Sequence, residues 1–374
     1  MRVAAIGDAH LGRSYLNVVS PAGVNQREHD FELSFEAAID AALAQSPDLV
    51  VWLGDVFDHP RPTYRSYRVA QRGLTRIREH GVGCVVISGN HDTPRLPGTG
   101  SPYSALADTF GELHFAHRLS YERFELPGLV VHAVPQMMTV EATLDALAEA
   151  ERTRSLDRTN LLLTHPRVTQ VVPRTYADIN EIELDDAVLQ SDLVLLGHWH
   201  IHTRVRDRVW YAGSTDTFTF ADDPASPKGI LVLDTDTAAV THVALEGQRR
   251  LVTLEPIYAA GVDTDELQRQ VIERVAEIPE GAIARLYVDM VDPEAYRLLD
   301  GDAIRAAAAH AMHLTLKPVF SDAANEVDLG EVDMDSMGAR WERYLEGQDL
   351  VGFDRDRIKQ LGRDYLAAAV EGAD

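Results

Sequence analysis

Short apolar runs recur along the first half of the chain, and each of them stops at a glycine or at a polar motif. The runs are four to six residues long, are rich in Val, Ile, Leu and Ala, and lie at residues 2–6, 48–53, 83–88, 160–164 and 193–196. Uninterrupted apolar runs of this length are typical of strands that are buried on both faces of a sheet. The pattern therefore predicts five buried strands.

Segments with helical spacing lie between these runs, at residues 31–44, 64–80 and 140–152. Alternation of strands with helices predicts an α/β domain built from layers. Two further strands, at residues 229–233 and 239–245, are expected to close this domain. Ligands of such sheets gather at the carboxyl ends of the strands, and the polar motifs of this chain fall at those ends.

A second alternating pattern follows residue 248 and predicts a smaller β-α-β-α-β domain at residues 248–320. Its elements are expected at residues 251–257, 265–277, 283–290, 302–312 and 313–319, with Asp263 or Thr264 capping the first helix. Residues 321–336 are acidic and weakly patterned, which predicts a linker. Residues 337–374 carry two amphipathic helical segments.

The length and composition agree with a globular protein of several domains. The chain has 374 residues, of which 45% are apolar, and contains no run of about 18 apolar residues that could span a membrane. The acidic residue Asp8 interrupts the N-terminal apolar run too early for that run to be the apolar stretch of a secretory signal. Cys84, the one cysteine, lies in an apolar run and is expected to be a core residue. These features predict a cytoplasmic location.

The formal net charge of −24 argues against a protein that coats nucleic acid by bulk attraction. A nucleic-acid enzyme stays open, because metal ions and local arginines can supply positive charge where a phosphate lies. Arg61, Arg65 and Arg204 follow polar motifs and are candidate contacts to a DNA backbone. The alternative is that these arginines form a solvated face of a helix or strand.

Side chains that bind metal ions follow each predicted strand. They form the motifs Gly7-Asp8-Ala9-His10, Gly54-Asp55-Val56-Phe57-Asp58, Gly89-Asn90-His91-Asp92, His165 and Gly197-His198-Trp199-His200. Side chains two residues apart on an extended segment face the same way, and the glycines are expected to let the backbone turn tightly. Carboxylate and imidazole donors suit Mn²⁺, Fe²⁺ or Zn²⁺, and the lack of thiolates argues against a structural zinc site.

The simplest assignment of these donors holds two divalent ions, with Asp55 bridging them. The other ligands divide into Asp8, His10 and His200 for one ion and Asn90, His165 and His198 for the other. Two adjacent ions activate a bridging water and take up the charge that develops when a phosphate ester is hydrolysed. A lone Gly-Asp pair or a lone histidine is usually structural, so the prediction depends on all the motifs occurring in this order.

His91 follows the predicted ligand Asn90, so its side chain is expected to point into the site without binding metal. It is the candidate acid that protonates the leaving oxygen, or a hydrogen-bond donor to the phosphate. Asp92 is expected to orient His91. Asp58 is expected to orient a metal ligand.

The order of these motifs resembles the calcineurin-like metallophosphoesterase superfamily over about residues 1–240. Within it the chain most resembles the SbcD-type nucleases, which are bacterial relatives of the meiotic recombination nuclease that processes DNA double-strand breaks. The resemblance implies a four-layer αββα sandwich at residues 1–247, a small α+β cap domain at 248–320, and a C-terminal helical pair at 337–374.

The same resemblance implies a metal-dependent DNA exonuclease or endonuclease that acts in double-strand-break repair. Its partners would be DNA, a second copy of the chain bound through residues 64–80 and 102–110, and an SbcC-type coiled-coil ATPase bound by the last helices. A plain packing role for those helices is an equal alternative.

The superfamily includes two alternative activities. A small-molecule or cyclic-nucleotide phosphodiesterase shares the same metal motifs and stays open. A protein phosphatase is less favoured, because His59 stands where those enzymes carry a phosphate-binding arginine. The chain also departs from many relatives at Asp216, where they carry glutamate.

Overall fold

The computed structural model describes residues 1–21, 23–173, 181–220, 222, 226–320 and 356–362. The chain forms two compact units. The first contains Met1–Thr253, Glu277–Arg285 and Ala308–Thr315, and the second contains Leu254–Ala276, Leu286–Ala307 and the described residues from Leu316 onward. The predicted linker at 321–336 lies outside the described residues, as do the predicted C-terminal helices except for residues 356–362, which are helical. The division at residues 247 and 248 stays a prediction.

The first unit contains a six-stranded sheet in the order β14-β13-β1-β2-β3-β4. Its parallel strands are β1 (Arg2–Ile6), β2 (Leu49–Leu53), β3 (Gly83–Ile87) and β4 (His114–Ala116). At one edge, β13 (Gly229–Asp234) runs antiparallel to β1, and β14 (Ala239–Ala244) runs antiparallel to β13. The predicted late strands therefore close this sheet, and Cys84 is a fully buried core residue of β3, as predicted.

A second six-stranded sheet has the order β11-β12-β10-β7-β6-β5. Its parallel strands are β6 (Leu129–Val134), β7 (Thr159–Thr164), β10 (Leu193–Leu196) and β12 (Val209–Tyr211). The edge strands β5 (Glu122–Leu126) and β11 (Thr203–Arg206) are antiparallel to their neighbours. The sequence pattern predicted β7 and β10 but missed the other strands of this sheet. Beside it, β8 (Arg167–Val168) and β9 (Glu183–Leu184) form a short parallel pair.

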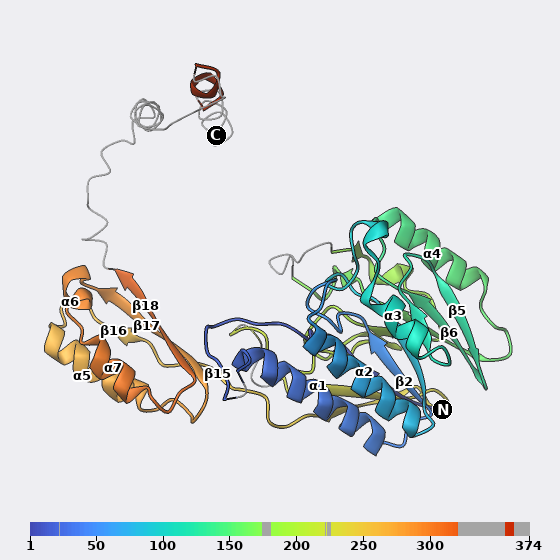
Figure 1. The fold of residues 1–374 in the computed structure, drawn as a ribbon, viewed down its shortest axis with the longest axis horizontal. Helices are drawn as coiled ribbons and strands as arrows, with labels where there is room; N and C mark the ends of the chain where they lie inside the picture. The colour runs from blue at the N-terminus through green and yellow to red at the C-terminus, as the bar shows by residue number, and fades with distance from the viewer. Residues whose placement is uncertain (22, 174–180, 221, 223–225, 321–355, 363–374) are drawn as a thin grey trace. The chain divides into compact units, whose positions relative to one another are not determined.

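Alternate residues of the strands face two separate apolar layers, which is why the runs are apolar throughout. In β1, Val3 and Ala5 pack between the two sheets, whereas Ala4 and Ile6 face the helices. The first sheet is covered by α1 (Gln26–Ala44), α2 (Tyr64–Glu79) and α3 (Pro102–Thr109), and the second by α4 (Val140–Arg152) (Figure 1). The layers form the predicted αββα sandwich.

Residues 251–320 form a separate four-stranded sheet with helices. Its strands are β15 (Leu251–Thr253), β16 (Ile257–Tyr258), β17 (Ile283–Val291) and β18 (His313–Phe320), and its helices are α5 (Thr264–Val275), α6 (Pro293–Arg297) and α7 (Gly301–Ala307). β15, β16 and β18 all pair with β17. Asp263 caps α5 by accepting a hydrogen bond from the backbone amide of Glu266 at 2.9 Å.

Three predicted boundaries were wrong by four residues or more. The strand predicted at residues 251–257 is divided into β15 and β16, and the gap contains Pro256, which has no amide to donate. α7 ends at Ala307 rather than at residue 312. α1 begins at Gln26, five residues before its predicted start, because the Asn25 side chain caps its polar first turn. Within the described residues, no helix is both long enough and apolar enough to cross a bilayer.

Candidate metal centre

The polar motifs come together where the parallel strands end. Asp8 and His10 follow β1, and Asp55, Asn90, His165 and the pair His198 and His200 follow β2, β3, β7 and β10 in turn. All seven of these predicted ligands are buried. The two sheets therefore contribute to one site, with three loops from the first sheet and two from the second.

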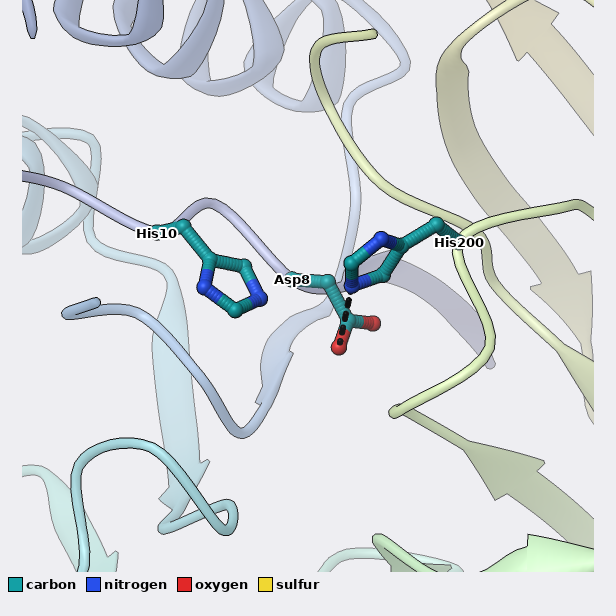
Figure 2. Close-up of side chains that lie close together, drawn as sticks. All are labelled: Asp8, His10 and His200. Atoms are coloured by element: carbon teal, nitrogen blue, oxygen red, sulfur yellow. Dashed lines mark ion pairs between the residues drawn. The ribbon is translucent and has the colours of Figure 1, made fainter. Parts of the chain in front are cut away.

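Three overlapping groups have ligand atoms close enough to share a cation. They are Asp8 with His10 and His200, His10 with Asp55 and His91, and Asp8 with Asp55 and His165, and within each group the atoms lie within 4.8 Å of one another. Figure 2 shows the first group, in which His200 Nε2 lies 3.9 Å from Asp8 Oδ1. This group coincides with the predicted ligand set for the first ion.

The predicted second set meets at the side-chain oxygen of Asn90. His165 Nε2 and His198 Nδ1 each lie 3.1 Å from Asn90 Oδ1. Asp55 connects the two sets, because its Oδ2 lies 3.2 Å from His165 Nε2 and 3.7 Å from His10 Nε2. Asp55 thus has the position that a bridging ligand requires.

Hydrogen bonds behind two imidazoles leave their inner nitrogens directed into the cluster. His165 Nδ1 lies 2.6 Å from the Leu53 carbonyl, and His10 Nδ1 lies 2.8 Å from Asp58 Oδ1. The opposite atom of His10, Nε2, is buried and has no hydrogen-bond partner among the described residues. An imidazole nitrogen that is buried, unpartnered and surrounded by oxygen donors fits a divalent ion. Asp58 thus contacts a candidate ligand, and its orienting role stays a prediction.

The backbone at the site is strained, which corrects the explanation of the two-residue spacing. Asp8, His10 and Asp55 have φ angles of 44°, 45° and 46°, and His198 has a φ of 90°. Residues other than glycine rarely adopt this left-handed conformation, and functional sites are where it accumulates. The side chains converge through left-handed loops and not because they alternate on an extended strand.

The glycines before the ligands are required by close packing rather than by tight turning. Of the four, Gly54 alone has a positive φ, of 89°. A Cβ atom on Gly89 would overlap the carboxylate of Asp55, and one on Gly197 would overlap the Leu53 carbonyl. A Cβ on Gly7 would lie 2.6 Å from the Gly213 carbonyl oxygen. The predicted role of these glycines in turns is therefore correct at one position only.

Burial and mutual proximity shift the protonation of these groups strongly. Burial raises the pKa of Asp8 to about 7. Burial also disfavours a charged His165, but the carboxylates of Asp55 and Asp8 outweigh it and raise the pKa of that imidazole to about 9. For His200, burial and then the neighbouring His10 hold the pKa well below its usual value. The carboxylates thus attract positive charge, which is the electrostatic condition for a cation site.

His91 lies inside the cluster, as predicted, but its surroundings allow two roles. Its backbone amide donates to Asp55 Oδ1 at 2.8 Å, and its Nδ1 lies 3.3 Å from the Asp58 carbonyl oxygen. Its ring centroid is 4.6 Å from that of His10. A proton donor to the leaving oxygen and an additional metal ligand are both compatible with this position.

Asp92 has a different role from the one predicted. Its carboxylate accepts hydrogen bonds from the Gly89 amide at 2.8 Å, from the Val56 amide at 2.9 Å and from the Tyr103 hydroxyl. Because the turn folds this carboxylate back toward the backbone, Asp92 joins the loops after β2 and β3. The groups that contact the His91 imidazole include Asp58 instead.

The three arginines predicted to contact DNA lie on the surface. Arg65 pairs with Glu32, with its Nε 2.6 Å from Oε1, and Arg204 Nη2 lies 2.7 Å from Asp207 Oδ1. Arg61 is exposed. Their role in DNA binding stays a prediction.

A different arginine contacts the metal centre. Arg13 Nη1 lies 3.1 Å from Asp58 Oδ1, and its guanidinium lies 4.9 Å from the centroid of the Phe218 ring. That ring packs against His10 and His200, at centroid distances of 4.7 and 4.0 Å. Sequence reasoning missed Arg13, although its place three residues after His10 was a usable signal.

The layered fold and the cluster of oxygen and imidazole donors define a metal-dependent phosphoesterase. Residues 1–202 match the calcineurin-like phosphoesterase family, and the chain belongs to this family. It is similar to proteins named DNA double-strand break repair protein Mre11, at low identity.

The Mre11 relatives differ in how much of each chain aligns. That of Saccharolobus solfataricus is 28% identical over 55% of this chain and 50% of its own length. That of Thermoplasma acidophilum is 25% identical over 72% of this chain and 71% of its own length. That of Methanosarcina acetivorans is 22% identical over 100% of this chain and 61% of its own length. The chain thus spans between half and about seven tenths of these relatives.

Proposed function

We propose that this protein is a DNA nuclease subunit that hydrolyses phosphodiester bonds with two divalent metal ions, of which Mn²⁺ is the favoured species. The observation that carries the proposal is the meeting of the two predicted ligand sets at Asp55, whose Oδ2 lies 3.2 Å from His165 Nε2 and 3.7 Å from His10 Nε2. Similarity to the Mre11 proteins supports DNA as the substrate.

Each side chain has a defined part in this proposal. Asp8, His10 and His200 would hold one ion, Asn90, His165 and His198 would hold the other, and Asp55 would contribute to both sites. Bound divalent ions supply an acidified water and neutralise charge on the phosphate.

His91 and Arg13 act on the substrate rather than on the ions. His91 delivers a proton to the leaving oxygen. Arg13, which lies beside Asp58 at the site, holds a phosphate oxygen of the DNA.

The test offers linear duplex DNA, single-stranded DNA and bis-p-nitrophenyl phosphate to the purified protein with Mn²⁺. Cleavage of DNA is expected. Cleavage of the small ester alone would replace the proposal with a small-molecule phosphodiesterase, and cleavage of none of the substrates would refute both.

The matched control is His198→Ala, which should lose one ion per protein. Full metal occupancy of that variant would remove His198 from the ligand set.

The proposal also covers the partners of the protein and its location in the cell. We infer a homodimer formed through α2 and α3, an SbcC-type ATPase as partner, and a cytoplasmic location. Tyr64 at the start of α2 is 93% exposed, which leaves an aromatic side chain free for such an interface. Sedimentation of the purified chain tests the dimer. Co-purification of the tagged chain from its native cells with a long coiled-coil ATPase tests the partner.

A further inference from the structure

Glu181 is a buried carboxylate that contacts the outer edge of His198. His198 Nε2 lies 2.8 Å from Glu181 Oε1, whereas His198 Nδ1 lies 3.1 Å from Asn90 Oδ1 inside the cluster. The Glu181 side chain is only 8% exposed. The two nitrogens of this imidazole therefore face two different environments, one a carboxylate and the other the metal centre.

This contact selects one tautomer of His198. A carboxylate accepts a hydrogen bond, so Nε2 carries the proton and donates it, and Nδ1 keeps a lone pair directed at the cluster. The backbone fixes the same residue from its other side, because the His198 amide donates to Asp8 Oδ1 at 2.9 Å. Ring and backbone are thus both held in the orientation that a ligand requires.

A buried arginine holds Glu181 in turn. Arg167 is 1% exposed, and its Nε lies 3.7 Å from Glu181 Oε1 without a hydrogen-bond partner among the described residues. Its other nitrogens are occupied, Nη1 by Glu183 and Nη2 by the Val172 carbonyl at 3.1 Å. The guanidinium is therefore anchored, and it presents its positive charge to Glu181.

We propose that Glu181 is a positioning residue that sets the affinity of the Asn90, His165 and His198 site for its divalent ion. A carboxylate behind a ligating imidazole fixes the ring and makes the inner nitrogen a stronger donor. Asp58 gives His10 the equivalent support at the other site, with 2.8 Å between His10 Nδ1 and Asp58 Oδ1. The inference rests on the ligand role of His198 in the proposed function.

Calorimetric titration of the full chain with Mn²⁺ tests the inference. We expect two ions to bind wild-type protein, and Glu181→Gln to weaken one of them by about 10- to 100-fold while leaving the other unchanged. Glu183→Gln is the matched control, because it removes a carboxylate from the same Arg167 without touching His198. It should bind both ions as wild type does.

A double-mutant cycle separates positioning from a general structural effect. In a His198→Ala background, which should retain one ion, Glu181→Gln should leave the affinity for that remaining ion unchanged, because the imidazole through which it acts is absent. Wild-type affinity for both ions in Glu181→Gln, or weaker binding of the remaining ion in the double variant than in His198→Ala, would overturn the proposal.

A measurement on the wild-type protein keeps the test independent of whether the variants fold. Nitrogen chemical shifts of His198 should report a proton on Nε2, and a proton on Nδ1 would overturn the proposal. Ion binding and DNA cleavage together distinguish failure of this inference from failure of the proposed nuclease function. Protein that binds two ions but cleaves no DNA refutes the function alone, whereas wild-type protein that binds no ion refutes both.

Discussion

Two buried polar clusters in the first unit differ in whether their own side chains balance the charges they contain. One is the metal centre, formed by the seven predicted ligands. The other, here named the Arg27 cluster, consists of Arg27, Asp30, Ser34, Asp216 and Arg249, and joins α1 to the segments that follow β12 and β14.

The charged groups of the Arg27 cluster are paired with one another by hydrogen bonds within the protein. The fully buried Arg27 side chain donates from Nη1 to Asp30 at 2.8 Å and from Nη2 to Asp216 at 3.1 Å. Asp216 also accepts from the Ser34 hydroxyl at 2.6 Å, and Asp30 accepts from Arg249 Nε at 2.6 Å. Two guanidinium groups therefore face two carboxylates, and each carboxylate has several donors.

The metal centre lacks this internal balance. His10 Nε2 has no partner among the described residues, and burial raises the pKa of Asp8 to about 7. The difference supports a structural role for the Arg27 cluster and the proposed cation-binding role for the other. Matched charges that are fully hydrogen-bonded hold segments together, whereas an excess of donors directed at one point binds a cation.

The largest expected effect is on turnover and belongs to the metal centre. His91→Ala should lower the rate constant of DNA cleavage by about 10²- to 10⁴-fold, because the leaving oxygen loses its proton donor. Two Mn²⁺ ions should still bind, as calorimetry would show. Normal cleavage would exclude the acid role, and loss of an ion would make His91 a ligand.

The next effect is on stability and belongs to the Arg27 cluster. Arg27→Met should lower the free energy of unfolding by about 3–5 kcal/mol, because it leaves the buried Asp216 without its charge partner. Urea denaturation of the metal-free protein measures this. The control Arg72→Met breaks an exposed pair with Glu36 and should cost about 0–1 kcal/mol. Equal losses in the two variants would remove the special role of the cluster.

Added Mn²⁺ should raise the free energy of unfolding through the metal centre and not through the Arg27 cluster. Mn²⁺ at about 100 times its dissociation constant should raise the free energy of unfolding by about 2.7 kcal/mol for each site filled. Arg27→Met should gain the same increment as wild type, whereas His198→Ala should gain less. Thermal melting with and without Mn²⁺ would show whether the two clusters are as independent as their contacts indicate.

The smallest expected effect concerns the edge of the metal centre. Arg13→Gln should raise KM for DNA about fivefold, because a half-exposed contact to phosphate is worth about 1 kcal/mol. Its turnover number should change little. Arg204→Gln provides the contrast, since that arginine pairs with Asp207 on the surface. A larger effect of Arg204→Gln would favour the arginines chosen from the sequence over Arg13.

Local sequence determined the framework and most of the candidate ligands. The apolar runs predicted β1, β2, β3, β7 and β10 with errors of one residue or less at each end. Such runs are readable because burial on both faces leaves no polar position. The motifs that end them predicted which side chains meet at one edge, because the ends of parallel strands lie together. β6 is also fully buried, but His132 interrupts its run and concealed it.

Only the tertiary structure decided how the donors are held. His198 and Glu181 are 17 residues apart and Arg27 and Asp216 are 189 apart, so no short sequence pattern joins them. The left-handed backbone of Asp8 and the close approach of Gly89 to Asp55 also depend on packing between loops. Periodicity records which face of an element is buried. Tautomer, charge balance and loop conformation depend on partners that folding brings from distant parts of the chain.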